Sequence, residues 1–193
     1  MPEHLIIQAY SDARRLPGGD LLPVIRLGNE ATWSRVLGES AAAVVILENC
    51  RSGADLQHAH MALSVAEARL GIAEATTRII ASAADTAESV LGLASYAGKS
   101  PRLVGLTWDR AAFCADIGCG LISETAEAAR LQLVIAARAA GVVAYDSPKA
   151  KIGGDGLSEA FIEHSRSLGF HGAVLLTQGR CGRISSNTSL ASE

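Results

Sequence analysis

Four carboxylates stand where apolar, strand-like segments of this sequence end. Glu48 ends AAAVVILE, Asp85 ends RIIASAAD, Asp109 follows RLVGLTW and Asp146 ends GVVAYD. In a parallel α/β protein, the carboxyl ends of the strands form the face where ligands bind. A ring of acids on that face predicts either a divalent cation with an anionic substrate or acid–base chemistry.

Arg26 lies at the end of another apolar segment, LPVIRL (22–27). A guanidinium at a strand end can hold a carboxylate through two parallel hydrogen bonds, so Arg26 is the best single candidate for binding substrate. The alternative is an ion pair with Glu48 or Asp85 across the sheet. The residue types alone leave these two interpretations open.

Two of the acids also have structural interpretations. Asp85 could be the N-cap of a helix over residues 86–97, with Glu88 three residues later completing a capping box. Asp146 precedes Ser147 and a proline, and aspartate favours the start of a turn, so we interpret it first as a turn residue.

The elements that must position these residues alternate along the chain. Strand-like segments, short and largely apolar as expected for strands buried on both faces, cover residues 5–10, 22–27, 41–48, 77–85, 102–108, 141–146 and 172–178. Helical patterns cover residues 31–39, 52–71, 85–97, 123–141 and 157–169. Ser52 is the expected N-cap of the second helix and Gly71 its C-cap. The alternation predicts an α/β fold of parallel βα units, TIM-barrel-like but incomplete, with six or seven strands instead of eight.

Composition limits the function classes. The chain has 193 residues, 49% of them apolar, and a net charge of −3, which gives no basic surface for nucleic acid. No segment is apolar enough to predict membrane binding or a signal peptide, so we expect a cytoplasmic protein. We expect one domain over residues 1–181 and a polar tail over 182–193, with residues 11–20 and the tail as flexible candidates.

The remaining candidate residues give weaker signals. The cysteines Cys50, Cys114, Cys119 and Cys181 form no CxxC pair, so we interpret them as reduced thiols without a metal. His58 and His60 are two residues apart on a predicted helix and point to different faces, so they make no metal pair. The glycine-rich stretch at 153–156 lacks the lysine of a phosphate loop and is better interpreted as a helix-entry turn.

Five segments, in order and with fitting spacing, carry a family resemblance. They are CRSGADLQHAHMALSVAEARLGI, IIASAADTAESVLGLASYAG, PRLVGLTWDRAAFCADIG, RLQLVIAARAAGVVAYDSP and GLSEAFIEHSRSLGFHGAVLLTQ. Over residues 22–181 the chain resembles the citrate lyase β-subunit-like proteins of the HpcH/HpaI aldolase superfamily. The resemblance implies a βα barrel and Mg²⁺-dependent cleavage or formation of a carbon–carbon bond. It also implies that the substrate is a CoA thioester of citryl or malyl type, or a small 2-oxo or dicarboxylic acid.

Carried over by position, the resemblance gives Arg26 the role of binding the substrate carboxylate. Asp85 stands at the position of the family's metal-binding glutamate, and Asp146 matches an Ile-Asp motif. The second metal ligand of the family falls on Ala112, which has no donor atom. Asp109, three residues earlier, is the nearest carboxylate that could take its place.

Other family motifs are changed. Gly28 replaces an asparagine, Glu48 and Asn49 replace Pro-Lys, and Leu-Thr-Gln at 176–178 replaces Ile-His-Pro. The first two strands of the family have no convincing counterpart. Two hypotheses therefore stand: a carbon–carbon lyase, and a non-catalytic binding or structural relative with a broken metal site. Because an incomplete barrel exposes strand edges, we also expect homo-oligomer contacts to cover them.

Overall fold

The computed structural model describes residues 4–9, 21–40, 43–148 and 157–176. The predictions for residues 11–20, the glycine-rich stretch at 153–156, Cys181 and the tail at 182–193 lie outside these residues. No helix in the described ranges is both long and apolar enough to cross a membrane.

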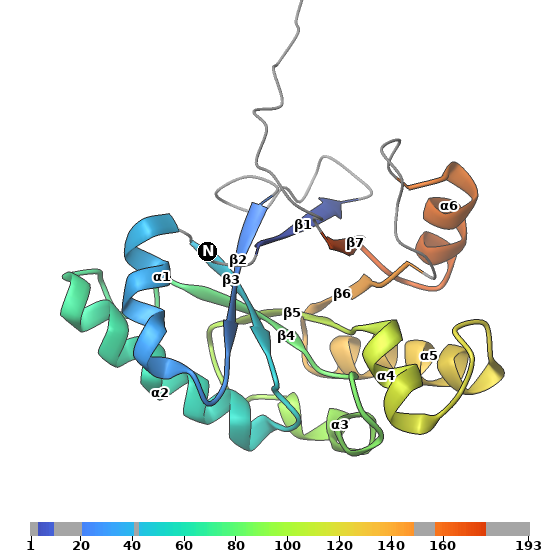
Figure 1. The fold of residues 1–193 in the computed structure, drawn as a ribbon, viewed down its shortest axis with the longest axis horizontal. Coiled ribbons are helices and arrows are strands. Elements are labelled where there is room, and N and C mark those ends of the chain that lie inside the picture. The colour runs from blue at the N-terminus through green and yellow to red at the C-terminus, as the bar shows by residue number, and fades with distance from the viewer. Residues whose placement is uncertain (1–3, 10–20, 41–42, 149–156, 177–193) are drawn as a thin grey trace, which may run out of the picture.

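Within the described ranges, seven strands form one closed sheet (Figure 1). They are β1 (His4–Ala9), β2 (Leu21–Arg26), β3 (Val44–Glu48), β4 (Arg78–Ser82), β5 (Leu103–Thr107), β6 (Val143–Asp146) and β7 (Gly172–Leu176). Strands β2 to β7 are parallel and follow one another in chain order. The predicted α/β fold, an incomplete relative of the eight-stranded barrel, is therefore confirmed.

β1 is the exception to the parallel order. It pairs antiparallel with β2, where Leu5 lies opposite Leu22, and with β7, where Leu5 lies opposite Leu176. One strand of the same chain thus fills the gap between the first and last parallel strands. Our reason for expecting oligomer contacts was wrong, because the edges of β2 and β7 are already paired. The oligomeric state itself stays a prediction.

The helices lie between the strands and pack on the outside of the curled sheet (Figure 1). They are α1 (Trp33–Ser40), α2 (Gly53–Leu70), α3 (Ala87–Gly92), α4 (Arg110–Ile117), α5 (Glu124–Ala139) and α6 (Glu159–Ser167), with short 3-10 turns at Glu30–Thr32 and Leu93–Tyr96. Ser52 and Gly71 cap α2 as predicted. Helix α4 was not predicted from the sequence.

Two clusters of buried residues show which face of the sheet each side chain occupies. The larger joins helix residues such as Leu56 and Leu133 to strand residues such as Val45 and Leu106. The smaller contains strand residues alone, namely Val24, Val44, Ile46, Ile80, Tyr145 and Val174. The smaller cluster is therefore the inside of the barrel, and the larger is the layer between sheet and helices.

Gly105 on β5 makes room for an aromatic ring inside the barrel. A Cβ atom at this position would lie 2.8 Å from the Tyr145 ring, which is closer than real contacts of that kind. Tyr145 is buried in the inner cluster. A residue without a side chain at position 105 therefore lets the ring fill the interior.

Candidate functional site

Arg26 and Glu48 face each other at the carboxyl ends of β2 and β3. They are Cα partners in the parallel register, and Arg26 Nε donates to Glu48 Oε2 at 2.5 Å. Side chains two residues apart on a strand share a face, so Arg26 follows Val24, and Glu48 follows Ile46, into the barrel. The pair lies at the mouth of the barrel, with 45% of the Arg26 side chain and 27% of the Glu48 side chain exposed.

The backbone around this pair is fixed by hydrogen bonds. The indole N–H of buried Trp33 donates to the Arg26 carbonyl at 3.2 Å. The N–H of Leu27 donates to the Glu48 carbonyl, and the N–H of Asn29 donates to the Arg26 carbonyl, both at 3.2 Å. The Arg26 guanidinium therefore extends from a rigid strand end, which is what a substrate-binding residue needs.

Asp85 lies at the same mouth, three residues beyond the end of β4. Its Oδ1 accepts hydrogen bonds from the Ser82 hydroxyl at 2.8 Å and from the Asp109 N–H at 2.7 Å. Burial raises the pKa of Asp85 to about 6, against the lowering effect of these two hydrogen bonds, and the charges of Asp109 and Glu48 raise it further. The Asp85 carboxyl group therefore keeps its proton to a higher pH than an ordinary aspartate does.

Asp85 is not the helix cap that we offered as its alternative. Thr86 is the N-cap of α3, and its side chain accepts a hydrogen bond from the Ser89 N–H. The Ser89 hydroxyl, not the Glu88 carboxylate, completes the capping box. The predicted helix cap was one residue too early, so the Asp85 carboxylate does not cap α3.

Asp109 is the N-cap of α4. Its Oδ1 accepts hydrogen bonds from the N–H groups of Ala111 at 2.8 Å and Ala112 at 3.1 Å. We expected Asp109 to replace the metal ligand that is missing at Ala112. Its carboxylate instead accepts a hydrogen bond from the backbone of Ala112. An acid directly before an alanine-rich stretch is a cap signal, and it could have revealed α4.

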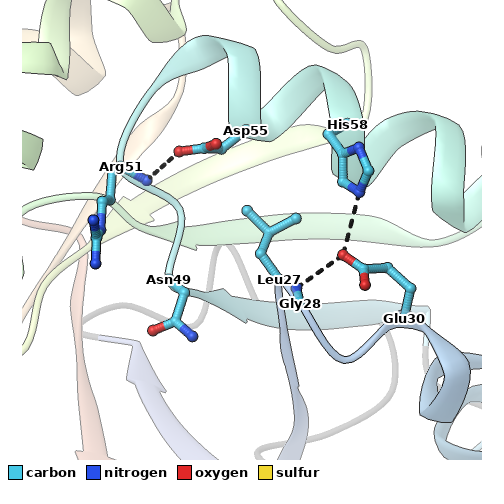
Figure 2. Close-up of a pocket in the computed structure, with 7 residues that line it drawn as sticks. All are labelled: Leu27, Gly28, Glu30, Asn49, Arg51, Asp55 and His58. Carbon is cyan, nitrogen blue, oxygen red and sulfur yellow. Dashed lines mark hydrogen bonds and ion pairs between the residues drawn. The ribbon is translucent and has the colours of Figure 1, made fainter.

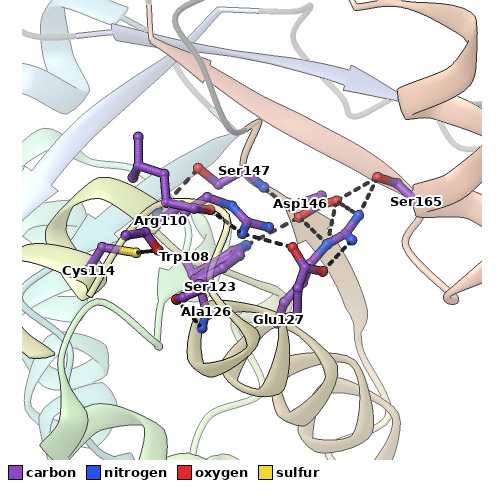
Figure 3. Close-up of polar contacts among 12 residues, drawn as sticks. Trp108, Arg110, Cys114, Ser123, Ala126, Glu127, Asp146, Ser147 and Ser165 are labelled. Atoms are coloured by element: carbon purple, nitrogen blue, oxygen red, sulfur yellow. Dashed lines mark hydrogen bonds and ion pairs between the residues drawn. The ribbon is translucent and has the colours of Figure 1, made fainter.

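Asp146, the last residue of β6, lies among polar side chains of the helices, near Glu127 and Ser165 (Figure 3). It accepts hydrogen bonds from Arg130 of α5, from the Ser165 hydroxyl of α6 at 2.5 Å and from the Trp108 indole N–H at 3.3 Å. Both Asp146 and Arg130 are at most 1% exposed. Because its neighbour Tyr145 faces inward, Asp146 must face the helices, and our interpretation of it as a simple turn residue was wrong.

A second arginine extends this outer network. Glu127 of α5 accepts from Arg130 and from Arg110, each at 3.0 Å. Burial alone would lower the pKa of Arg130, but its bonds to Asp146 and Glu127 raise it above the ordinary value. The Arg110 guanidinium also lies 4.6 Å from the centre of the Trp108 ring. These contacts join β6 to α4, α5 and α6.

A pocket of about 530 Å³ lies beside the mouth, between the end of β2 and the start of α2 (Figure 2). It is lined by Leu27, Gly28, Glu30, Asn49, Arg51, Asp55 and His58. Its charged side chains already have partners: Glu30 contacts His58, Arg51 contacts Glu88, and Asp55 accepts a hydrogen bond from the Arg51 backbone N–H. The sequence did not predict this pocket, because its residues come from three separate segments: the stretch after β2, the loop after β3 and the first turns of α2.

The surroundings of Cys50 and of the two histidines of α2 are defined by burial and by hydrogen bonds. Burial raises the pKa of Cys50 to about 12, so this thiol is a poor nucleophile. His58 is exposed and contacts Glu30, whereas His60 accepts a hydrogen bond from Arg102 at 3.1 Å. The two rings therefore point to different faces of α2, as expected.

Among solved structures the chain has clear neighbours, whereas no family model and no curated protein matches it. RipC from Yersinia pestis is 25% identical; the match covers 76% of this chain and 66% of RipC, with a TM-score of 0.59. An HpcH/HpaI aldolase/citrate lyase family protein from Burkholderia cenocepacia J2315 is 18% identical over 78% of this chain and 65% of that one, with a TM-score of 0.61. This chain has the HpcH/HpaI aldolase/citrate lyase superfamily fold. The resemblance read from the sequence is confirmed at that level.

The structure of a third neighbour contains bound ligands. CitE from Mycobacterium tuberculosis, solved in complex with magnesium, acetoacetate and coenzyme A, is 22% identical. That match covers 80% of this chain and 55% of CitE, with a TM-score of 0.57. The chain thus spans between about half and two thirds of the length of these three neighbours.

The mouth residues can be tested against the Mg²⁺ that the superfamily fold implies. No group of three or more metal-ligating side chains stands together in the described ranges, and Ala112 offers no donor. Mg²⁺, however, usually takes only one or two protein carboxylates and fills its shell with water and substrate oxygens. Asp85, with Glu48 on the neighbouring strand, meets that smaller requirement. The donor set therefore fits a weakly held cation.

Proposed function

We propose that the chain is a carbon–carbon lyase acting on a small 2-oxo or dicarboxylic acid, or on its CoA thioester. The observation that carries this proposal is the pairing of one guanidinium with nearby carboxylates at the barrel mouth. Arg26 would bind the substrate carboxylate, and Asp85 would hold Mg²⁺, with Glu48 beside it. A bound Mg²⁺ supplies polarisation of the 2-oxo group, which favours the enolate that carbon–carbon cleavage requires.

The protein's own residues then have defined tasks. Arg26, on a strand end fixed by Trp33, orients the substrate carboxylate toward the mouth. Ser82 and the Asp109 N–H hold one oxygen of Asp85, which directs the other toward the ligand. The inner apolar cluster below the mouth, with Tyr145 in it, excludes water from the barrel interior.

A second candidate function is a binding or structural relative without catalysis. The observation that favours it is Ala112 at the expected second ligand position, together with the capping role of Asp109. A subunit of this kind would keep Arg26 for binding an acid while having no measurable affinity for a divalent cation.

Metal binding separates the two candidates. We expect calorimetry to show Mn²⁺ binding that is strengthened by pyruvate or oxaloacetate and lost in Asp85→Ala. Glu39→Ala is the matched control, because Glu39 forms an exposed ion pair with Arg35 of its own helix, away from the mouth. Thermal unfolding of each variant checks that it is folded. A wild-type protein that binds no Mn²⁺ at millimolar concentration would overturn the lyase proposal and leave the binding relative.

A further inference from the structure

The substrate-binding arginine of this mouth already holds a carboxylate from its own chain. Arg26 Nε and Glu48 Oε2 are 2.5 Å apart, and the two residues are Cα partners at the ends of adjacent strands. A substrate carboxylate that binds Arg26 in the same way must take the place of Glu48. Since both side chains are partly exposed, the exchange needs no rearrangement of the core.

The displaced Glu48 has a defined neighbour on its other side. In the register of β3 and β4, Leu47 lies opposite Ala81, so Glu48 continues the ladder opposite Ser82. Ser82 and Ile80 share the inner face, and the Ser82 hydroxyl holds Asp85 Oδ1. Glu48 therefore lies between Arg26 on one strand and the Ser82–Asp85 pair on the next.

This placement has an electrostatic consequence. With Glu48 on Arg26, its charge is compensated. When a substrate carboxylate takes Arg26, the mouth gains a negative charge. Glu48 and Asp85, at the ends of neighbouring strands, are then left as like charges, which is unfavourable unless a cation is present.

We propose that Glu48 couples the two ligands of the mouth. It holds Arg26 when the mouth is empty, and it joins Asp85 at the divalent cation when a substrate carboxylate takes Arg26. This inference rests on the proposed function and adds a residue that the superfamily resemblance did not supply, because the matching position in that family is part of a Pro-Lys motif. Coupling of this kind must be reciprocal, so each ligand raises the affinity of the other by the same factor.

The test is a complete binding cycle measured by calorimetry at constant pH. Mn²⁺ is titrated with and without pyruvate, and pyruvate is titrated with and without Mn²⁺. For the wild type we expect each ligand to tighten the other by about tenfold or more, within the usual range of coupling between sites. For Glu48→Gln we expect pyruvate to bind more tightly than in the wild type when Mn²⁺ is absent. Mn²⁺ should bind more weakly, and the coupling factor should fall toward one.

Two further variants keep the result interpretable. Glu48→Asp retains the charge on a shorter side chain and should recover part of the coupling, whereas Glu39→Gln should behave as the wild type. Wild-type coupling that persists in Glu48→Gln would overturn the inference and leave the lyase proposal standing. A wild-type protein that binds neither probe would instead overturn the lyase proposal itself, so the two failures are distinguishable.

Discussion

Two arginine–carboxylate pairs at the same end of the barrel have opposite surroundings. Arg130 and Asp146 are buried between sheet and helices, and Ser165, Trp108 and Glu127 complete their hydrogen bonds. Arg26 and Glu48 lie inside the mouth and are partly exposed. Both acids end a strand, yet one stabilises the fold and the other is available for exchange. The face of the strand on which an acid lies, more than its position along the strand, decides what it can do.

The largest expected effect is on the buried pair. Asp146→Asn keeps the size of the side chain but leaves Arg130 buried without its main counter-charge. Breaking a buried ion pair from one side typically costs about 3–5 kcal/mol, so we expect a loss of that order in the free energy of unfolding. Urea denaturation followed by circular dichroism measures it.

The mouth pair is the control for that measurement. Glu48→Gln should change the free energy of unfolding by less than about 1 kcal/mol, because partly exposed ion pairs contribute little. Equal losses in Asp146→Asn and Glu48→Gln would show that the two pairs do not differ as their burial indicates.

The comparison can be sharpened at the opposite end of the barrel. Glu67 and Arg102 are both fully buried, and Arg102 donates to both Glu67 oxygens at 2.8 Å. We expect Glu67→Met to cost about 3 kcal/mol, and Glu67→Met with Arg102→Met to cost less than the sum of the single changes. A double-mutant cycle by urea denaturation measures this coupling. Additive losses would mean that the pair does not act as a unit.

A smaller effect than those of the buried pairs concerns Asp85 and depends on pH. Burial raises the pKa of Asp85 from 3.8 to about 6, so the folded state binds a proton more tightly than the unfolded state does. Protonation of Asp85 therefore stabilises the folded state at low pH. This stabilisation is lost as pH rises from about 4 through about 6.

The substitution Asp85→Asn removes the charged form and its cost. It should stabilise the protein by on the order of 1 kcal/mol at pH 8, a discounted value because Asp85 is only partly buried, and should have little effect at pH 4. Thermal unfolding across this pH range gives the sign directly. Destabilisation at pH 8 would show that Asp85 is held as a well-compensated carboxylate.

Much of the fold was readable from the sequence. The six parallel strands lie within one to three residues of the predicted segments, because short apolar runs separated by capped helices leave few alternatives. Helix α4 was missed because it has only eight residues and no apolar periodicity. The antiparallel direction of β1 was not predictable either, since a short apolar segment carries no information about the direction of its neighbours.

The candidate site was only partly predictable. Arg26 and Glu48 form the ion pair across the sheet that was the alternative interpretation of Arg26. The face on which Asp146 lies could not be predicted, because strands buried on both sides show no alternation between apolar and polar residues. In the structure its hydrogen bonds to Arg130 and Ser165 place it on the helix side of the sheet. The helix cap that was the alternative role of Asp85 falls one residue later, because Thr86 and Ser89 form the capping box.

The antiparallel strand β1 also has a kinetic consequence. Its partner β7 lies almost the whole length of the described chain away, so the contact that seals the barrel is the most distant in sequence. Neighbouring βα units can assemble locally, but this last contact requires the closure of a very long loop. We therefore expect sealing by β1 to be a late event in folding. Changes at the β1–β7 pairing should then mainly speed unfolding and leave the folding rate nearly unchanged.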